Sequence, residues 1–160
     1  MNFQAYHGRT FDLLALRGAQ PVRNVRLDQT LFGTDSGGDV CTGIQKLAQR
    51  WVLGFLTIRG TMKFLPALGT DFLREGRRGQ FRTEADIVAA FGFAMVPLGK
   101  QLRNEERADQ PNDERYGGAE LLRVTLTGDS MSLTVRISSL AGTSREVILP
   151  ISVVPSVLQL

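Results

Sequence analysis

The spacing of apolar side chains changes twice along the chain. From about Val40 to Thr57 apolar residues recur every three or four positions, which predicts an amphipathic helix. Its apolar stripe consists of Val40, Ile44, Leu47, Ala48, Trp51, Val52, Phe55 and Leu56. Because a stripe this wide must be covered on more than one side, we expect this helix to lie in the core.

A second helix is predicted to begin at Thr83. Thr83 and Asp86 have the spacing of a capping box, in which each residue hydrogen-bonds the backbone of the other. The apolar positions that follow with helical period are Ile87, Val88, Phe91, Met95, Val96, Leu98 and Leu102. Pro97 lies inside this pattern and is expected to kink or split the helix near Val96, because proline has no N–H to donate.

Beyond Ala119 the period falls to two. Apolar and polar residues alternate over residues 122–127, 132–137 and 147–151, with turn residues between them. This alternation predicts three strands in an antiparallel meander, and Pro150 predicts that the third strand ends there or lies at an edge.

The predicted fold class is therefore α+β, with two main helices packed with a C-terminal three-stranded meander. Valines, leucines and arginines mixed over residues 22–32 allow an added N-terminal strand. The composition of residues 33–39 is that of a link. We thus expect residues 1–39 to be an extension, partly extended or flexible, and residues 40–160 to be one domain.

The segment between the two helices is unusually apolar for a loop. Residues 55–73 read FLTIRGTMKFLPALGTDFL, in which Gly60, Pro66 and Gly69 oppose helix while large apolar residues such as Phe64 remain. Loops usually face water. An apolar one is expected either to fold back onto the core or to be held for a partner. Here we expect a rigid loop that folds onto the helices and presents part of its surface, formed by Phe64, Leu65, Pro66, Leu68 and Phe72.

Four arginines follow in the sequence REGRRGQFR: Arg74, Arg77, Arg78 and Arg82. Two glycines in this segment predict a mobile loop or a hairpin-like turn. The basic side chains form a solvated surface, dock to an acidic partner or contact phosphate groups. The sequence leaves these three interpretations open.

Charge is distributed unevenly, although the net charge is only +3. Residues 1–82 carry twelve basic and six acidic side chains, whereas residues 83–160 carry seven and ten. Only three of the nineteen basic residues are lysine, and arginine is common both at protein interfaces and in nucleic-acid-binding proteins. No apolar run approaches the roughly 20 residues of a membrane span, and no secretory signal is visible. We expect no membrane partner.

Residues typical of catalysis or metal binding are few. Cys41 and His7 are the single cysteine and histidine, too few for a disulfide or a Cys/His zinc site within the chain. A Cys–His nucleophile pair is disfavoured because His7 lies in an unpatterned segment. The acidic residues of positions 105–114 would supply two carboxylates for glycoside hydrolysis, but so hydrophilic a cluster is typical of a solvated helix end. We predict no catalytic residue, cofactor or metal.

The order of segments resembles the baseplate wedge or sheath-initiator family of contractile phage tails, which is shared with the type VI secretion baseplate. Members have an amphipathic helix, a Leu-Thr…Gly…Pro…Gly loop, a later helix, an acidic–Pro–Arg motif and strands. Here Leu56-Thr57, Gly60, Pro66 and Gly69 match the loop in order, and the match covers about residues 40–151.

One departure concerns the family's Glu-Pro-Arg motif, which is thought to dock neighbouring baseplate components. Asp113-Glu114-Arg115 stands nearest its place, without the proline and with aspartate in place of glutamate. Residues 104–107, NEER, are a less well placed candidate. Arg115 is the position that we carry over.

The resemblance implies a non-enzymatic structural protein of the virion, in the tail baseplate and assembled in the host cytoplasm. It would join the wedge and nucleate or anchor the tail sheath in multiple copies of a symmetric assembly, through protein contacts and β-strand augmentation. The partner-binding residues expected are Gly60, Phe64, Pro66, Gly69, Phe72 and Arg115. The apolar C-terminal tail packs on its own core or on a neighbour. The alternative is a nucleic-acid-binding module that uses the four arginines of residues 74–82, and nucleic acid is the less favoured partner.

Overall fold

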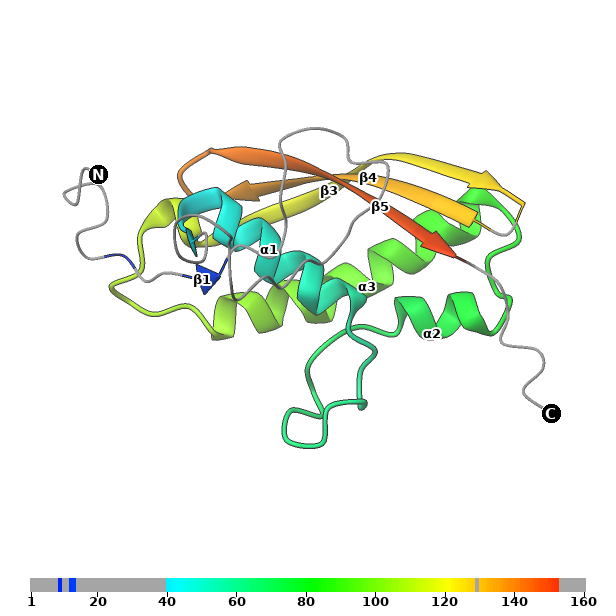
Figure 1. Cartoon of the computed structure of the whole chain (residues 1–160), viewed down its shortest axis with the longest axis horizontal. Helices are drawn as coiled ribbons and strands as arrows, with labels where there is room; N and C mark the ends of the chain where they lie inside the picture. The colour runs from blue at the N-terminus through cyan, green and yellow to red at the C-terminus, as the bar shows by residue number, and fades with distance from the viewer. Residues whose placement is uncertain (1–8, 10–11, 14–39, 129, 153–160) are drawn as a thin grey trace, which may run out of the picture.

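The structure is a computed structural model that describes residue 9 and residues 12–13, 40–128 and 130–152. Within these ranges the fold is α+β, as predicted (Figure 1). The helices are α1 (Gly43–Leu56), α2 (Phe72–Arg77), α3 (Glu84–Asn104) and the short 3₁₀ helix η2 (Asn112–Glu114). The strands are β1 (Asp12–Leu13), β2 (Val40–Cys41), β3 (Tyr116–Thr127), β4 (Ser130–Ser139) and β5 (Ser144–Ser152).

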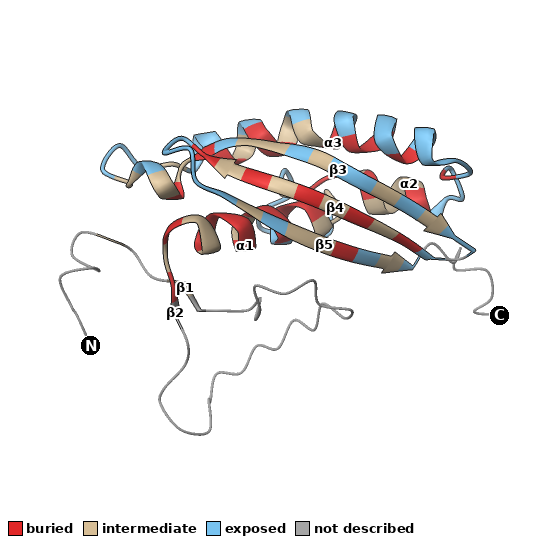
Figure 2. Cartoon of the chain, turned by 90° about the horizontal axis from the view of Figure 1, so that it is seen from above, coloured by how far each residue is buried: buried red, intermediate tan, exposed pale blue. Residues whose placement is uncertain are grey.

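The C-terminal strands form an antiparallel sheet in the order β3-β4-β5, which confirms the predicted meander. The central strand β4 alternates between buried and half-buried residues, and its inner face carries Leu133, Val135 and Ile137 (Figure 2). β5 lies at an edge and continues past Pro150 to Ser152, so the proline marks an edge strand and not its end.

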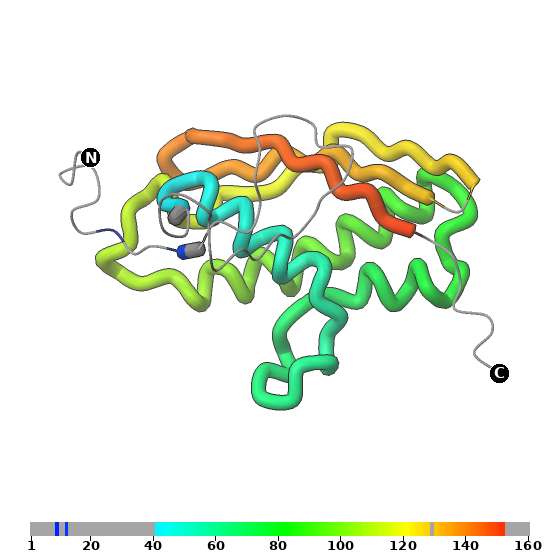
Figure 3. The backbone as a smooth tube through the Cα atoms, in the orientation of Figure 1, coloured from blue at the N-terminus to red at the C-terminus, as the bar shows by residue number. Residues whose placement is uncertain are grey.

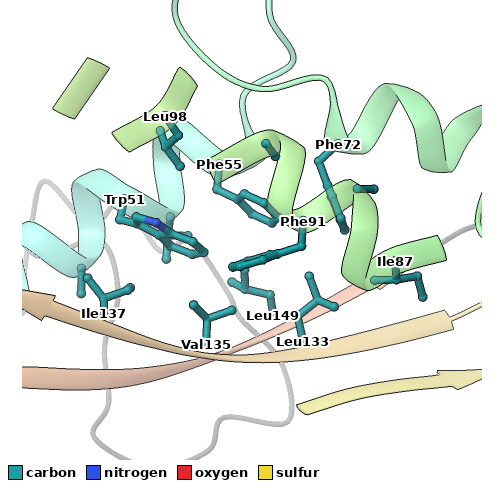
Figure 4. Packing of buried hydrophobic residues seen from close by; sticks show 14 of the residues in the cluster. Trp51, Phe55, Phe72, Ile87, Phe91, Leu98, Leu133, Val135, Ile137 and Leu149 are labelled. Carbon is teal, nitrogen blue, oxygen red and sulfur yellow. The ribbon is translucent and has the colours of Figure 1, made fainter. Parts of the chain in front are cut away.

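Helices α1 and α3 cover one face of this sheet and enclose the core between the two layers (Figures 1 and 4). Trp51 stacks on Phe55 with ring centroids 5.0 Å apart, and Phe55 contacts Phe72 at 4.7 Å. Trp51 and Phe55 are fully buried. The wide apolar stripe of the first predicted helix is thus covered by the sheet, by α3 and by α2.

Two predictions about the helices need correction. The segment predicted as a mobile loop or turn contains α2, because Phe72 at its start is buried against Phe55 and the following Phe81 is buried too. Pro97 does not split α3, which is a single helix of 21 residues. Its buried face continues on both sides of the proline, through Ala94 and Leu98.

The start of α3 is the predicted capping box. The Asp86 backbone N–H donates to the Thr83 hydroxyl at 3.2 Å, and the Thr83 N–H donates to the Asp86 carboxylate at 2.8 Å. Hydrogen bonds from the backbone and the side chain of Thr83 to the carboxylate hold the pKa of Asp86 below its ordinary value. The sequence therefore predicts this helix boundary to the residue.

Asp12 and Leu13 form the two-residue strand β1, which pairs antiparallel with β2 in a sheet separate from β3-β4-β5. The extended segment predicted at residues 22–32 and the C-terminal tail at 153–160 lie outside the described residues. In the described part of the chain, α3 is long and apolar enough by length and composition to cross a membrane, which differs from the expectation that no apolar run approaches this length. The core helix of a soluble protein passes the same test, and the inner face of α3 is packed in the core.

Candidate functional site

Residues 57–71 form a loop that extends away from the body of the molecule on the helix side (Figures 1 and 3). We call this segment the projecting loop. It connects the end of α1 to the start of α2 and contains the Gly–Pro–Gly series that the sequence singled out. The loop therefore stands out from the core instead of folding back onto it.

The base of the projecting loop is held by a short parallel bridge between Ile58 and Thr70. The Arg59 N–H donates to the Thr70 carbonyl at 3.0 Å, and the Thr70 N–H donates to the Thr57 carbonyl at 2.8 Å. The Thr70 hydroxyl also donates to the Phe55 carbonyl, at 2.8 Å. Thr70 is fully buried, so these bonds replace water for its polar groups and fix where the loop leaves the core.

Glycine is required at position 69 because the backbone of Thr57 comes very close to it at the loop base. Its φ is +101°, and a Cβ at this position would lie 2.2 Å from the Thr57 carbonyl oxygen. Its N–H donates to the side-chain oxygen of Gln101 on α3 at 3.3 Å. Any other residue would push the two strands of the loop base apart. Gly69 thus acts by shaping the loop, and it is buried away from a partner.

Charged groups strengthen the base from the side of α2. Arg74 donates to the Asp71 carboxylate at 2.6 Å and to the Arg59 carbonyl, while the Arg59 guanidinium lies 3.6 Å from Asp71. Arg74 is therefore committed to a loop contact within its own chain. Among the four arginines predicted to meet an acidic partner or phosphate, Arg74 is the one that the structure places in an internal network.

The tip of the projecting loop carries apolar side chains into solvent. Phe64 is 89% exposed, Leu65 59% and Met62 45%. The tip has its own turn structure, because the Gly60 N–H donates to the Pro66 carbonyl at 3.1 Å and the Leu65 N–H donates to the Met62 carbonyl at 3.2 Å. Three exposed large apolar residues on a hydrogen-bonded loop form the kind of surface that marks a protein contact.

A shallow pocket of about 120 Å³ lies between the loop base, α2 and α3. One wall is apolar and includes Phe93 and Pro97, and the other carries Arg59, Asp71 and Glu75. Pockets for drug-sized ligands usually measure about 300–1,000 Å³. This one has room for a single side chain of a partner, at the base of the projecting loop.

Besides the buried Gly69, two more residues expected at a partner interface are placed elsewhere. Phe72 is 1% exposed and belongs to the core, where it contacts Phe55 and Phe81. Arg115 is half-buried, and its guanidinium donates to the carbonyls of Arg107 and Ala108 at 3.1 Å each. Both side chains hold their own chain together, whereas Gly60, Phe64 and Pro66 are exposed on the projecting loop.

Glu114, next to Arg115, forms a buried charge cluster at the start of α1. Its carboxylate is 1% exposed, accepts from the Lys46 ammonium at 2.9 Å and accepts from the Gly43 N–H at 3.1 Å. The Arg9 guanidinium lies 3.7 Å from Glu114 and 2.7 Å from Asp113. The acidic–Arg segment that resembles the family motif thus caps a helix of its own chain.

The remaining acidic residues of the charged stretch are also engaged. Glu105 pairs with Arg50 at 2.9 Å, Glu106 accepts from the Tyr116 N–H at 2.6 Å, and Asp109 pairs with Arg107. No group of three or more His, Cys, Asp or Glu side chains that would suit a metal ion occurs among the described residues. The carboxylates of this stretch therefore bind a backbone N–H group and arginine side chains of their own chain.

No protein-family model, no curated protein and no solved structure matches this chain.

Arg77, Arg78 and Arg82 are exposed around the end of α2 and the turn before α3. In the described part of the chain their guanidinium groups have no ion-pair or hydrogen-bond partner, in contrast to Arg74. They remain available for an acidic or phosphate-bearing partner.

Cys41 is buried in β2, and its pKa is raised to about 11, chiefly because burial disfavours the thiolate. We expect the folded protein at pH 8 to react with iodoacetamide about a hundredfold more slowly than the unfolded chain, since the thiolate is the reactive form. Mass spectrometry of timed samples, with and without denaturant, measures both rates. Equal rates would contradict the buried placement of Cys41.

Proposed function

We propose that this protein is a non-enzymatic structural subunit of a contractile tail baseplate, which joins wedge components and anchors or nucleates the sheath. The observation that carries the proposal is the projecting loop, whose base is fixed by backbone bonds and ion pairs while Phe64 at its tip is 89% exposed. A rigid base lowers the ordering cost of binding, and an aromatic side chain supplies an anchor for a partner's pocket.

The loop that carries Phe64 is also the segment that resembles the family's Leu-Thr…Gly…Pro…Gly loop. In this chain Gly69 allows the close approach at the base, and the Pro66 carbonyl accepts the Gly60 N–H at 3.1 Å near the tip. The motif residues thus have a common physical role, which is to hold the apolar tip away from the core. This role supports a docking loop on the baseplate component.

Strand augmentation by a sheath subunit would take place at the sheet edges. Within the described residues β3 and β5 each pair on one side only, with β4. Pro150 removes one donor from β5, so an added strand on that side would pair with the part of β5 before it. The edge of β5 from Ser144 to Leu149 is the segment that we assign to such a strand.

The proposal is tested with a Phe64→Glu variant. We expect beads that carry the variant to capture about tenfold less tail sheath and wedge protein from cells producing the particle, because a charged side chain cannot fill an apolar pocket. The thermal unfolding of the variant should match that of the wild type, since Phe64 makes almost no contact with its own core. Quantitative mass spectrometry reports the captured proteins.

Leu140→Glu is the matched control. Leu140 is 58% exposed in the β4–β5 turn, so the substitution adds the same charge to another exposed apolar position. It should leave capture unchanged. Equal capture of baseplate proteins by wild type and Phe64→Glu would refute the assigned role of the loop.

The alternative function is nucleic-acid binding through Arg77, Arg78 and Arg82, which the exposure of all three favours. Fluorescence anisotropy with single-stranded DNA over a series of salt concentrations tests it. For the alternative, replacing the three arginines with glutamine should reduce the slope of log affinity against log salt by about one for each lost phosphate contact. If the protein does not bind the DNA, or if the substitutions leave the affinity unchanged, nucleic-acid binding through these arginines is excluded.

A further inference from the structure

The outer face of α3 is apolar along the middle of the helix. Val88 is 51% exposed, Phe93 78% and Val96 76%, and Figure 2 shows the exposed side of α3 running along its length. A Cβ added to Gly92, in the middle of this face, would meet nothing within 4 Å. No described part of the chain covers this face at its centre.

The exposed residues follow one ridge with a spacing of four. The ridge consists of Glu84, Val88, Gly92, Val96 and Lys100, and all five are exposed. A valine lies four residues from Gly92 on each side, and the two ends of the ridge carry opposite charges, Glu84 and Lys100. Ridges of residues four apart are the surfaces that helices interdigitate when they pack, with axes about 8–10 Å apart.

We propose that a second copy of this chain packs against this face, with the two α3 helices antiparallel around a two-fold axis at Gly92. In this arrangement Glu84 of each chain lies opposite Lys100 of the other, and Val88 lies opposite Val96. Gly92 allows the close approach at the axis. The same patch serves both copies, as closed two-fold symmetry requires.

The order of charges along the ridge favours a second, antiparallel copy of this chain as the partner. Antiparallel self-pairing joins an acidic end to a basic end twice, whereas parallel self-pairing would place Glu84 on Glu84 and Lys100 on Lys100. Neither an unrelated partner nor a lipid surface requires charges that are complementary under a two-fold rotation. The inference uses α3 alone and does not rest on the proposed baseplate function.

Charge reversal tests the pairing directly. By sedimentation velocity from about 10 μM to about 1 mM, a range suited to a small interface, we expect the wild type to dimerise. Glu84→Lys alone and Lys100→Glu alone should each weaken the dimer about tenfold or more, because each places like charges opposite one another at both ends. The double variant should regain wild-type dimerisation, and an equimolar mixture of the two single variants should form a heterodimer.

Arg77→Glu is the control, since it makes the same charge change as Lys100→Glu at an exposed position outside α3. It should not alter dimerisation. Circular dichroism checks that every variant remains folded. Val96→Asp provides a test that does not depend on the helix ends, and it should abolish the dimer.

The position of the axis is tested by Gly92→Cys. Two cysteines at a helix–helix crossing are close enough to bridge, so mild oxidation should give a disulfide-linked dimer. The wild type should give none, because Cys41 is buried. A chain that stays monomeric to about 1 mM, a double reversal that fails to restore the dimer, or α3-dependent binding to phospholipid vesicles in place of dimers would each overturn the proposal. A monomer would leave the role of the projecting loop unaffected.

Discussion

Replacing Glu114 with alanine is expected to lower the free energy of unfolding by about 3–5 kcal/mol, because it breaks the buried ion pair between its carboxylate and the Lys46 ammonium. The two side chains are 1% and 11% exposed and lie 2.9 Å apart. The substitution also removes the acceptor for the Gly43 N–H at the first turn of α1. Urea denaturation followed by tryptophan fluorescence measures the change, since Trp51 is the single tryptophan and lies in the core.

Two further variants separate the loss of a buried charge partner from a general effect of removing glutamate. Glu146→Ala removes an exposed carboxylate that pairs with Arg136 at 2.9 Å, and should cost about 1 kcal/mol or less. The double variant Lys46→Met, Glu114→Met removes both buried charges and should be more stable than Glu114→Ala. If Glu114→Ala were as mild as Glu146→Ala, the cluster would not hold the start of α1.

Gly69→Ala is expected to cost about 3 kcal/mol or more. A non-glycine residue at a φ of +101° is strained by about 1–3 kcal/mol, and the new methyl group would overlap the Thr57 carbonyl at the loop base. Relief of this overlap must separate the two strands of the projecting loop and weaken the Thr70 N–H bond to Thr57. Chemical denaturation measures the loss.

Gly79→Ala isolates the effect of the overlap. Gly79 has a φ of +70°, and its Cβ would meet nothing within 4 Å, so only the backbone strain of about 1 kcal/mol applies. A clear excess for Gly69→Ala is expected. Equal costs at the two glycines would show that the close approach of Thr57 and Gly69 does not constrain the loop.

The helices and strands with a regular apolar period were predicted well, because the burial of one apolar face determines their secondary structure. The helix predicted over 40–57 is observed as α1 at Gly43–Leu56, because Val40–Cys41 form β2 instead. This helix and the strands after residue 119 bury one face each, so the spacing of apolar residues records which face is inside. The capping box at Thr83 was predictable for a similar reason, since both of its partners lie within four residues. The strands themselves extend further than the alternation indicated, because β3 begins at Tyr116.

The features that the sequence did not predict depend on contacts between residues far apart in the chain. Helix α2 forms because Phe72 reaches Phe55, which no local pattern in a glycine-rich arginine segment indicates. Glu114 meets Lys46 across 68 residues, so its charge is buried although its neighbours in the sequence are polar. Likewise, the order of Gly60, Pro66 and Gly69 predicted a loop, but only the packing around Thr70 decides that the tip points outward.

The most direct test of the proposed function is an affinity capture of the tagged chain from the cells that produce it, with and without nuclease treatment, followed by mass spectrometry. The proposal predicts recovery of tail sheath, tail tube and wedge proteins in amounts that nuclease does not change. Recovery of nucleic acid together with proteins that disappear after nuclease treatment would contradict it, and would assign the function to the exposed arginines near α2.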